Sequence, residues 1–245
     1  MQKHFSTAGP SKADLHYLLD PMSRFDLEEL LSLIAQERYF VLHAPRQTGK
    51  TTCLLALRDL LNTEGRYAAL YVNVEAAQAA RGNIAAAAEA ILSKLAEQAI
   101  DTLGSPVVET QREALLARGA NAALASALRE LSQALSKPLV LLLDEVNALV
   151  GDTLISLLRQ IRAGYTDRPK AFPQTVVLCG VRDVRDYRMT QADGEVITGG
   201  SAFNIKAESL RLGDFSEPEL RALYRQHTQA TGQVFSEKAL HLLGI

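Results

Sequence analysis

The sequence has few of the features that mark secreted, membrane or disulfide-rich proteins. It contains only two cysteines, Cys53 and Cys179, and each lies in an apolar stretch far from the other. Such a pair is typical of small buried side chains in a reducing compartment, and not of a disulfide or a metal site. No apolar run reaches the ~18 residues that a membrane span needs, and residues 1–12 lack the apolar core of a secretory signal. We therefore expect a cytoplasmic protein with no membrane partner.

An excess of one charge is also missing. The chain has 26 Lys and Arg residues against 28 Asp and Glu residues, a formal net charge of −2, which argues against a nucleic-acid binder that uses its whole surface. Basic residues do concentrate in one third of the chain. They predict a solvated, ion-paired face, with an arginine finger for a neighbouring subunit or a nucleic-acid patch as alternatives. These residues are Arg159, Arg162, Arg168, Lys170, Arg182, Arg185 and Arg188.

The strongest motif lies between Tyr39 and Cys53, in the stretch YFVLHAPRQTGKTTC. Tyr39–His43 is an apolar run of strand length, and helix-forming residues follow from Lys50 to Leu61. The loop between them matches the phosphate-binding pattern G-x-x-x-x-G-K-[ST] at every defined position but the first, where Ala44 stands. Alanine fits that position only if its backbone φ is below zero.

A loop of this kind aims successive backbone N–H groups and the positive end of a helix dipole at one point, which suits a di- or triphosphate. Lys50 would reach the β- and γ-phosphates, and the Thr51 hydroxyl would ligate Mg²⁺. The alternative is an ordinary strand–turn–helix with a chance match. The residues predicted to bind the nucleotide are Ala44, Pro45, Arg46, Gln47, Thr48, Gly49, Lys50, Thr51 and Thr52.

A second motif follows about 95 residues later. Leu139–Leu143 is apolar at every position, as in a strand buried on both faces of a parallel sheet, and Asp144 and Glu145 follow at once. Open α/β sheets bind ligands at the carboxyl ends of their strands. Asp144 would hold the magnesium, and Glu145 would orient and deprotonate an attacking water. The alternative is that both residues only begin the next loop.

The remaining segments predict alternating strands and helices. After a third buried strand, Gln174–Cys179, either Arg182 or Asp183 would sense the phosphate, or an ion pair would fix the loop. Residues 184–202 predict a mobile, exposed loop for a partner or for gating, with plain disorder as the alternative. Residues 1–24 predict an extended arm with a short turn near Leu15–Leu19, either a tether or a segment near the nucleotide base.

Other elements follow from periodicity, caps and breakers. We expect one large α/β core, residues 1–215 with the arm, and the beginning of a helical lid, residues 216–245, in a chain that is either truncated or the first part of a longer protein. The predicted helices are Asp26–Glu37, Asn83–Leu103, 109–136 with a weak point at Gly119, 152–163, Ser216–Ala230 and a last one from Ser236; the further strands are Tyr67–Val74 and Phe203–Leu212.

The segments HAPRQTGKTT, LVLLLDEVNAL and VVLCGVRDVRDY resemble the AAA-like ATPases of the additional-strand P-loop class, prokaryotic relatives of the AAA+ and STAND-type ATPases. The resemblance implies a three-layer α/β/α P-loop sandwich with a mainly parallel sheet. In it the P-loop strand is central, flanked by the Gln174–Cys179 and Phe203–Leu212 strands. It also implies ATP and Mg²⁺ as cofactors. Two departures from the family pattern are Ala44 and the lack of an identifiable lid arginine of the sensor-2 kind.

The predicted function is a magnesium-dependent ATPase in which Glu145, Lys50 and Arg182 carry the catalysis. The alternative is a nucleotide-gated switch or scaffold that binds ATP with little or no hydrolysis, and a third, weaker hypothesis is a nucleic-acid-loading ATPase. ATP and ADP are the expected ligands, and a second copy of the chain or another protein is the expected partner. The choice of ATP over GTP rests on the resemblance and on the lack of an N/T-K-x-D guanine-reading motif.

Overall fold

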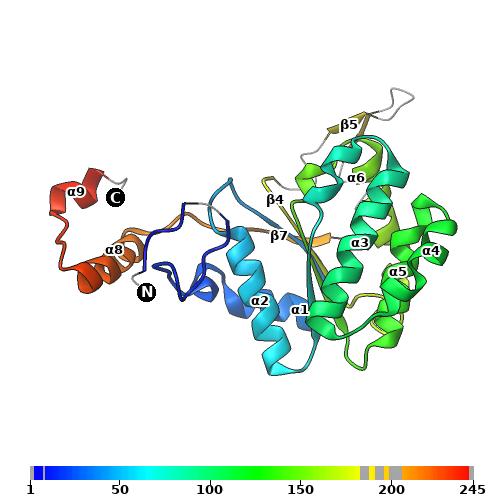
Figure 1. The fold of residues 1–245 in the computed structure, drawn as a ribbon, viewed down its shortest axis with the longest axis horizontal. Coiled ribbons are helices and arrows are strands. Elements are labelled where there is room, and N and C mark those ends of the chain that lie inside the picture. Colours follow the sequence, from blue (N-terminus) through cyan, green and yellow to red (C-terminus); the bar gives the residue numbers. More distant parts are fainter. Residues whose placement is uncertain (1–2, 8, 183–187, 191–195, 199–205, 243–245) are drawn as a thin grey trace.

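The computed structural model describes residues 3–7, 9–182, 188–190, 196–198 and 206–242. Strands and helices alternate through most of the chain (Figure 1). The strands are β1 Tyr39–His43, β2 Ala68–Asn73, β3 Leu139–Asp144, β4 Thr175–Gly180, β5 Arg188–Thr190, β6 Val196–Thr198 and β7 Lys206–Arg211. The α-helices are α1 Leu27–Ala35, α2 Lys50–Glu64, α3 Ile84–Leu103, α4 Val107–Ala117, α5 Ala120–Ala134, α6 Asp152–Ala163, α8 Glu217–Thr231 and α9 Glu237–Leu242. Short 3₁₀ helices are η1 Pro21–Arg24, η2 Glu75–Ala80, η3 Val146–Ala148 and η4 Tyr165–Asp167.

Five strands form one sheet in the order β2-β3-β4-β1-β7, and every neighbouring pair is parallel. This confirms the predicted parallel sheet, with β4 between the strand of the phosphate-binding loop and the strand of the acidic pair. β1 is flanked by β4 and β7 as predicted, but it is not the middle strand. β4 is the middle strand, with β3 and β2 on one side of it. β1 and the edge strand β7 lie on the other side.

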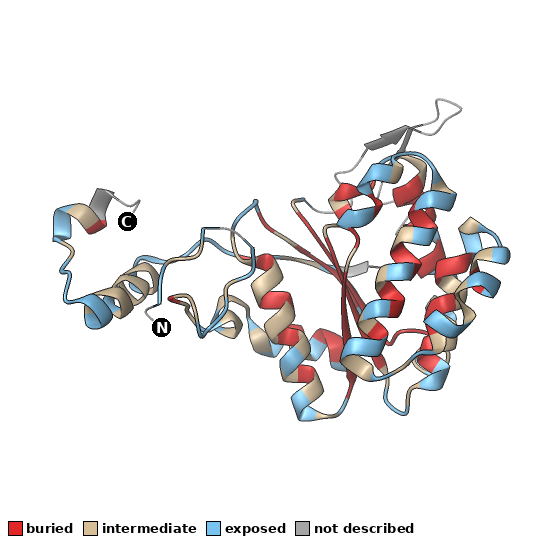
Figure 2. Cartoon of the chain, viewed as in Figure 1, coloured by how far each residue is buried: buried red, intermediate tan, exposed pale blue. Residues whose placement is uncertain are grey.

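Helices cover both faces of the sheet, and each face has its own apolar core (Figures 1 and 2). Because side chains alternate along a strand, Phe40 and Leu42 pack in the core beneath α1 and α2, whereas Tyr39 and Val41 pack in the core beneath α3 to α6. The three-layer sandwich is therefore confirmed, and strands buried on both faces explain the continuous apolar runs in the sequence.

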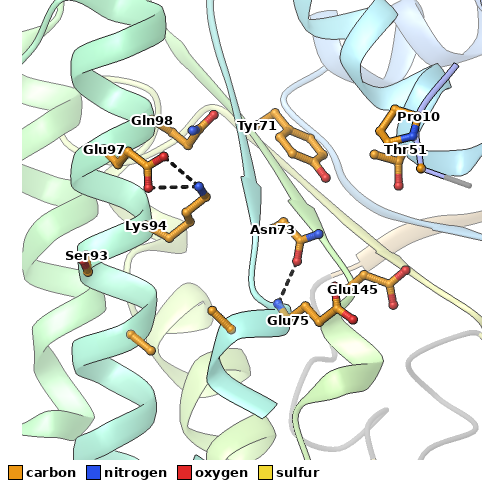
Figure 3. Close-up of a pocket in the computed structure, with 13 residues that line it drawn as sticks. Pro10, Thr51, Tyr71, Asn73, Glu75, Ser93, Lys94, Glu97, Gln98 and Glu145 are labelled. Atoms are coloured by element: carbon orange, nitrogen blue, oxygen red, sulfur yellow. Dashed lines mark hydrogen bonds and ion pairs between the residues drawn. The ribbon is translucent and has the colours of Figure 1, made fainter. Parts of the chain in front are cut away.

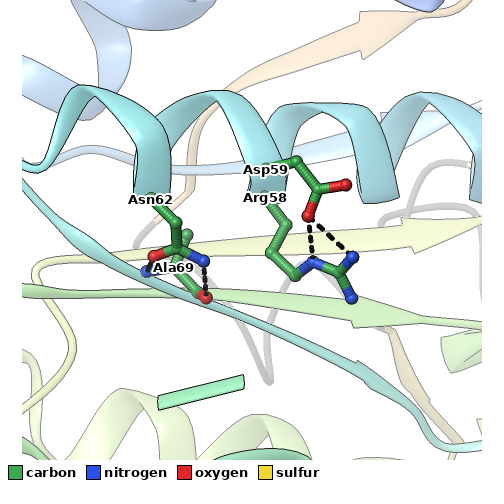
Figure 4. Close-up of polar contacts among 4 residues, drawn as sticks. All are labelled: Arg58, Asp59, Asn62 and Ala69. Atoms are coloured by element: carbon green, nitrogen blue, oxygen red, sulfur yellow. Dashed lines mark hydrogen bonds and ion pairs between the residues drawn. The ribbon is translucent and has the colours of Figure 1, made fainter. Parts of the chain in front are cut away.

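β2 lies at one edge of the sheet, so its outer backbone groups need partners from elsewhere. The amide of Asn62 on α2 supplies them at Ala69: Asn62 Nδ2 donates to the Ala69 carbonyl at 2.9 Å, and the Ala69 N–H donates to Asn62 Oδ1 at 2.8 Å (Figure 4). One turn away, Arg58 pairs with Asp59 at the surface. The side chain of Asn62 thus makes the two hydrogen bonds that a neighbouring strand would make, and it fixes α2 to the edge of the sheet.

The predicted caps and breaks are largely confirmed. Asp26 caps α1 by accepting from the Glu29 N–H, Gly65 ends α2 in the left-handed region, and Ser216 and Glu219 form a capping box at the start of α8. The predicted helix 109–136 is two helices, because Gly119 adopts a φ of 97° between them. Within the predicted exposed loop 184–202, β5 and β6 pair as an antiparallel hairpin, and the rest of that prediction lies outside the described residues.

The N-terminal arm folds back on itself and contacts α8. His4 and His16 form an isolated bridge, and the Leu18 N–H and carbonyl both bond to the amide of Gln226, at 3.2 and 2.9 Å. Phe5 stacks against Tyr224 of α8 with ring centroids 5.2 Å apart. The Ser11 N–H donates to Thr52 Oγ1 on α2 at 3.1 Å, so the arm lies beside both α2 and α8. Among the described residues, no helix is long and apolar enough to cross a membrane.

Candidate functional site

The phosphate loop, residues 44–49, connects the carboxyl end of β1 to the first residue of α2. Two of its residues have left-handed backbone conformations, Gln47 with a φ of 64° and Gly49 with a φ of 87°. Ala44 is not among the residues with positive φ, so an alanine fits where the sequence pattern has glycine. Ala44 is buried, and its N–H donates to the carbonyl of Gly180 on β4 at 3.2 Å. This bond ties the start of the loop to the neighbouring strand.

Lys50 lies beneath the loop and not in solvent. Only 6% of its surface is exposed, and its Nζ donates to the carbonyls of Ala44 and Pro45 at 3.0 and 2.7 Å. A buried ammonium needs such partners because burial without hydrogen bonds is costly. The loop therefore holds a positive charge at its centre, at the N-terminus of α2, where the helix dipole also favours an anion.

The Thr51 hydroxyl and the Asp144 carboxylate meet at the mouth of this loop. Thr51 Oγ1 donates to Asp144 Oδ2 at 2.7 Å, the Tyr71 hydroxyl donates to the same oxygen at 2.9 Å, and the Glu145 N–H donates to Oδ1 at 2.9 Å. Asp144 is fully buried. Three donors thus satisfy a carboxylate that lies two strands away from β1 in the sheet.

The donor set at Thr51 and Asp144 fits Mg²⁺. The Thr51 hydroxyl donates its hydrogen bond to Asp144, which leaves the lone pairs of its oxygen for a cation, and a hard cation prefers such oxygen ligands. Within the described part of the chain, no group of three or more His, Cys, Asp or Glu side chains is placed to hold a metal. A magnesium ion here would therefore take its remaining ligands from water and a bound phosphate, as Mg²⁺ commonly does.

Glu145 follows Asp144 directly and adopts a left-handed backbone, with φ of 58° and ψ of 36°. A non-glycine residue in this region carries local strain that surrounding contacts must compensate. The contact here is with Asn147, whose Nδ2 donates to Glu145 Oε2 at 3.1 Å. Glu145 and Thr51 line the same open cleft of about 1000 Å³, which continues past Tyr71 and Asn73 to Lys94 on α3 (Figure 3).

The peptide group between Gly180 and Val181 joins the loop to the support of Glu145. Its carbonyl accepts the Ala44 N–H at 3.2 Å, and its N–H donates to Asn147 Oδ1 at 3.1 Å. Arg182 follows and is exposed. It makes no hydrogen bond or ion pair with the residues that the structure describes, so it is not brought to Lys50 and Asp144, and Asp183 lies outside those residues.

Three residues at this site were missed from the sequence: Tyr71, Asn147 and Cys179. Burial first, and then the neighbouring Asp144 carboxylate, raise the pKa of Tyr71 above its ordinary value and that of the Cys179 thiol well above its own. Both groups therefore keep their protons beside Asp144. The sequence offers no specific signal for Tyr71, which lies in an apolar strand, and none for the role of Asn147.

Tyr71→Phe should lower the free energy of unfolding by about 1–2 kcal/mol, because Asp144 stays buried with one donor fewer. Tyr67→Phe is the matched control: the Tyr67 hydroxyl is buried with no hydrogen-bond partner among the described residues, so its removal should be neutral or stabilising. Urea unfolding of both variants measures the difference. Equal stability of the two variants would contradict the assigned role of the Tyr71 hydroxyl.

A second, smaller pocket of about 200 Å³ adjoins the loop on its other side. The arm, the start of α2 and α8 line it, with Phe5, Tyr17, Phe215 and Leu223 contributing its apolar wall and Gly49 its contact with the loop. Cys53 also lines it, and burial raises the pKa of this thiol to about 11. The pocket is therefore mainly apolar and opens directly beside the phosphate loop.

The model of one protein family, described as AAA domain, matches residues 34–187. No curated protein sequence matches the chain. Among solved structures, Drosophila ORC bound to DNA gives a TM-score of 0.51 at 16% identity, covering 84% of this chain and 32% of that one. AMPPCP-bound DnaA from Aquifex aeolicus gives 0.50 at 12% identity, covering 92% and 57%. A chain of the E. coli MS115-1 HORMA:CdnC:Trip13 complex gives 0.50 at 13% identity, covering 91% and 64%.

In each of these pairs, the chain covers less than two thirds of the length of the solved chain. At such low identities the likeness establishes the fold alone.

Proposed function

Because this chain belongs to the AAA domain family of P-loop ATPases, we propose that it binds ATP with Mg²⁺ and hydrolyses the γ-phosphate. The observation that carries this proposal is the 2.7 Å hydrogen bond between Thr51 and Asp144. Thr51 lies in the first turn of α2, after the loop that follows β1, and Asp144 ends β3, with β4 between those two strands. Their side chains nevertheless meet beside the buried Lys50. A loop with a cation, a hydroxyl and a carboxylate at one point suits a triphosphate with magnesium.

The roles of the residues follow from their positions. Lys50 exchanges its two carbonyl partners for oxygens of the β- and γ-phosphates. Of the predicted residues 44–52, residues 46–52 offer backbone N–H groups to the phosphates, because Pro45 has no N–H and the Ala44 N–H is bonded to Gly180. Thr51 and Asp144 would hold a magnesium ion, which would neutralise phosphate charge when bound. Glu145 accepts the proton of the attacking water. Arg182 reaches the γ-phosphate only if its segment moves inward from its exposed position.

The apolar pocket beside Gly49 is the proposed binding site for the base of the nucleotide, that is, its adenine ring. Its volume of about 200 Å³ is below the ~300–1,000 Å³ typical of pockets for whole ligands, which suits a single ring system. Phe5 and Tyr17 come from the arm, and Leu223 comes from α8. A base bound here would contact the arm and the proposed lid, residues 216–245, as well as the core, residues 1–215.

A nucleotide-gated switch with little or no hydrolysis is the second candidate. One observation favours it: within the described residues, no arginine contacts Lys50, Asp144 or Glu145. Efficient hydrolysis would then need Arg182 to move, or an arginine from a second copy of the chain or another protein.

We propose such a protein partner before a nucleic acid, because the formal net charge is −2. Among the structural neighbours, ORC has been solved bound to DNA and DnaA bound to AMPPCP, so a nucleic-acid partner remains as the weaker candidate.

The two free, buried cysteines support a reducing, cytoplasmic location.

Lys50→Ala should weaken the binding of a fluorescent ATP analogue about 10- to 100-fold, because each hydrogen bond to a charged group contributes about 1.5–3 kcal/mol. Titration with and without Mg²⁺ measures the affinity. Lys137→Ala, which removes an exposed lysine away from the loop, is the control and should bind as the wild type does. Unchanged affinity in Lys50→Ala would remove the nucleotide proposal altogether.

A further inference from the structure

Arg24 joins segments that are far apart in the sequence. Its Nη1 donates to the Thr48 carbonyl at 3.4 Å, its Nη2 donates to the Gly213 carbonyl, and its Cζ lies 3.7 Å from the centroid of the Phe215 ring. Thr48 belongs to the phosphate loop. Gly213 and Phe215 belong to the linker, residues 212–216, that leads from β7 to α8. One side chain therefore contacts the loop and the linker at the same time.

The backbone of Arg24 is fixed relative to α2. Asp20 caps the short helix η1 by accepting the Met22 N–H at 2.9 Å, and the Ser23 hydroxyl donates to the Asp20 carbonyl at 2.8 Å. At the start of η1, the Pro21 carbonyl accepts from Cys53 Sγ on α2 at 3.4 Å. The guanidinium thus extends from a segment that is bonded to α2 toward the phosphate loop and the linker.

The linker has little else to hold it. The Leu212 N–H donates to the His43 carbonyl at 3.0 Å and anchors its first residue. After that, Asp214 pairs at the surface with Arg211 of β7 at 3.4 Å, a Cβ built at Gly213 would meet nothing within 4 Å, and Phe215 is 38% exposed. Between Leu212 and the α8 cap at Ser216, Arg24 is the described residue that connects the linker to the phosphate loop. The direction in which α8 leaves the core therefore depends on this contact at its start, together with the contacts of the arm with Gln226 and Tyr224 further along the helix.

We propose that Arg24 is a positioning residue that couples the conformation of the phosphate loop to the orientation of α8. This rests on the proposed function, because a bound phosphate is what would displace the Thr48 carbonyl. A donor–acceptor distance of 3.4 Å is at the long limit for a hydrogen bond, so a small change of the loop makes or breaks it. The planar guanidinium donates from its fork and stacks through its face at once, which a lysine does not do. Such coupling is reciprocal, so the position of α8 also changes nucleotide affinity.

The test measures the α2–α8 distance directly. Thr63→Cys on α2 and Gln229→Cys on α8 place spin labels at two exposed positions, while Cys53 and Cys179 are buried and stay unlabelled. The labelled protein is compared with Arg24→Ala, Arg24→Lys and the control Arg66→Ala. Arg66 also lies over an aromatic ring, at 5.1 Å from the Tyr67 centroid, but contacts neither loop nor linker. Distances are recorded without nucleotide and with ADP or AMPPCP and Mg²⁺.

We expect a single narrow distance peak in the labelled parent protein and in Arg66→Ala, which shifts when nucleotide is added. Both Arg24 variants should lose the narrow peak and its shift. If only about a tenth of the molecules then keep the binding-competent arrangement, their nucleotide affinity falls about tenfold. If Arg24→Ala does not fold, Phe215→Ala removes the stacking partner and should broaden the peak likewise.

Three results would overturn the proposal. The Arg24→Ala peak could match that of the parent protein in width and response. Arg24→Lys could behave as the parent protein does, which would leave no role for the fork and the stacking face. Affinity could fall with no change in distance, which would make Arg24 a direct ligand of the nucleotide. The nucleotide-free measurement still tests the hold of Arg24 on the linker if no nucleotide binds, so the two proposals fail separately.

Discussion

Glu145→Gln should lower the rate of phosphate release from ATP by about 10²- to 10⁴-fold, the range contributed by a general base. The affinity for ATP should not change, because the amide preserves the shape of the side chain and Lys50, Thr51 and Asp144 are untouched. The amide can still meet Asn147, but it cannot accept the proton of the attacking water. A phosphate-release assay and a binding titration on the same preparation separate the two effects.

Glu75→Gln is the matched control for that experiment. Glu75 lines the same cleft as Glu145 (Figure 3), and it is exposed. Loss of its charge should leave both phosphate release and affinity unchanged. Equal rates in Glu145→Gln and the wild type would remove Glu145 from the role of base. A wild type that releases no phosphate, alone or with candidate partners, would instead favour the nucleotide-gated switch.

Gly164→Ala should cause a large loss of stability for the addition of a single methyl group. A Cβ at Gly164 would lie 2.2–2.4 Å from ring atoms of Phe172, which is fully buried. Forcing extra volume into a packed core costs about 1–3 kcal/mol, and more where the neighbour cannot move. For a chain of this size each kcal/mol lowers the melting temperature by about 2–4 °C, so thermal unfolding resolves the effect.

Gly82→Ala provides the comparison. A Cβ at Gly82 meets nothing within 4 Å, and the backbone there has no positive φ. The same methyl group should be neutral or slightly stabilising, because alanine restricts the unfolded chain. If the two variants have the same melting temperature, the packing of Phe172 against Gly164 does not restrict the size of the side chain at position 164.

The sequence predicts the parts of this fold that depend on local pattern. Strands buried on both faces leave continuous apolar runs, as in Leu139–Leu143, and caps such as Asp26 and Gly65 announce helix ends. The motifs also identify Lys50, Thr51 and Asp144, since the chemistry of phosphate and magnesium requires those side-chain types. Their roles in catalysis stay predictions.

Long-range contacts between segments leave no such pattern. Gly164 predicted only the end of a helix, yet its lack of a side chain makes room for the Phe172 ring. Tyr71 reads as one more apolar strand residue, and its bond to Asp144 depends on the pairing of β2 with β3. Arg24 lies in a stretch without periodicity. Its contacts are with Thr48, 24 positions further along the chain, and with Gly213, 189 positions further along. Physical proximity of this kind is decided by the whole fold.

The peptide group between Gly180 and Val181 has a mechanical consequence. A peptide unit is planar and moves as one rigid group. The carbonyl of this peptide group is hydrogen-bonded to Ala44, and its N–H is hydrogen-bonded to Asn147. A rotation of the peptide group therefore displaces both the first residue of the phosphate loop and the side chain that supports Glu145. In the proposed mechanism, a shift of the chain after β4 would therefore change phosphate binding and proton transfer together.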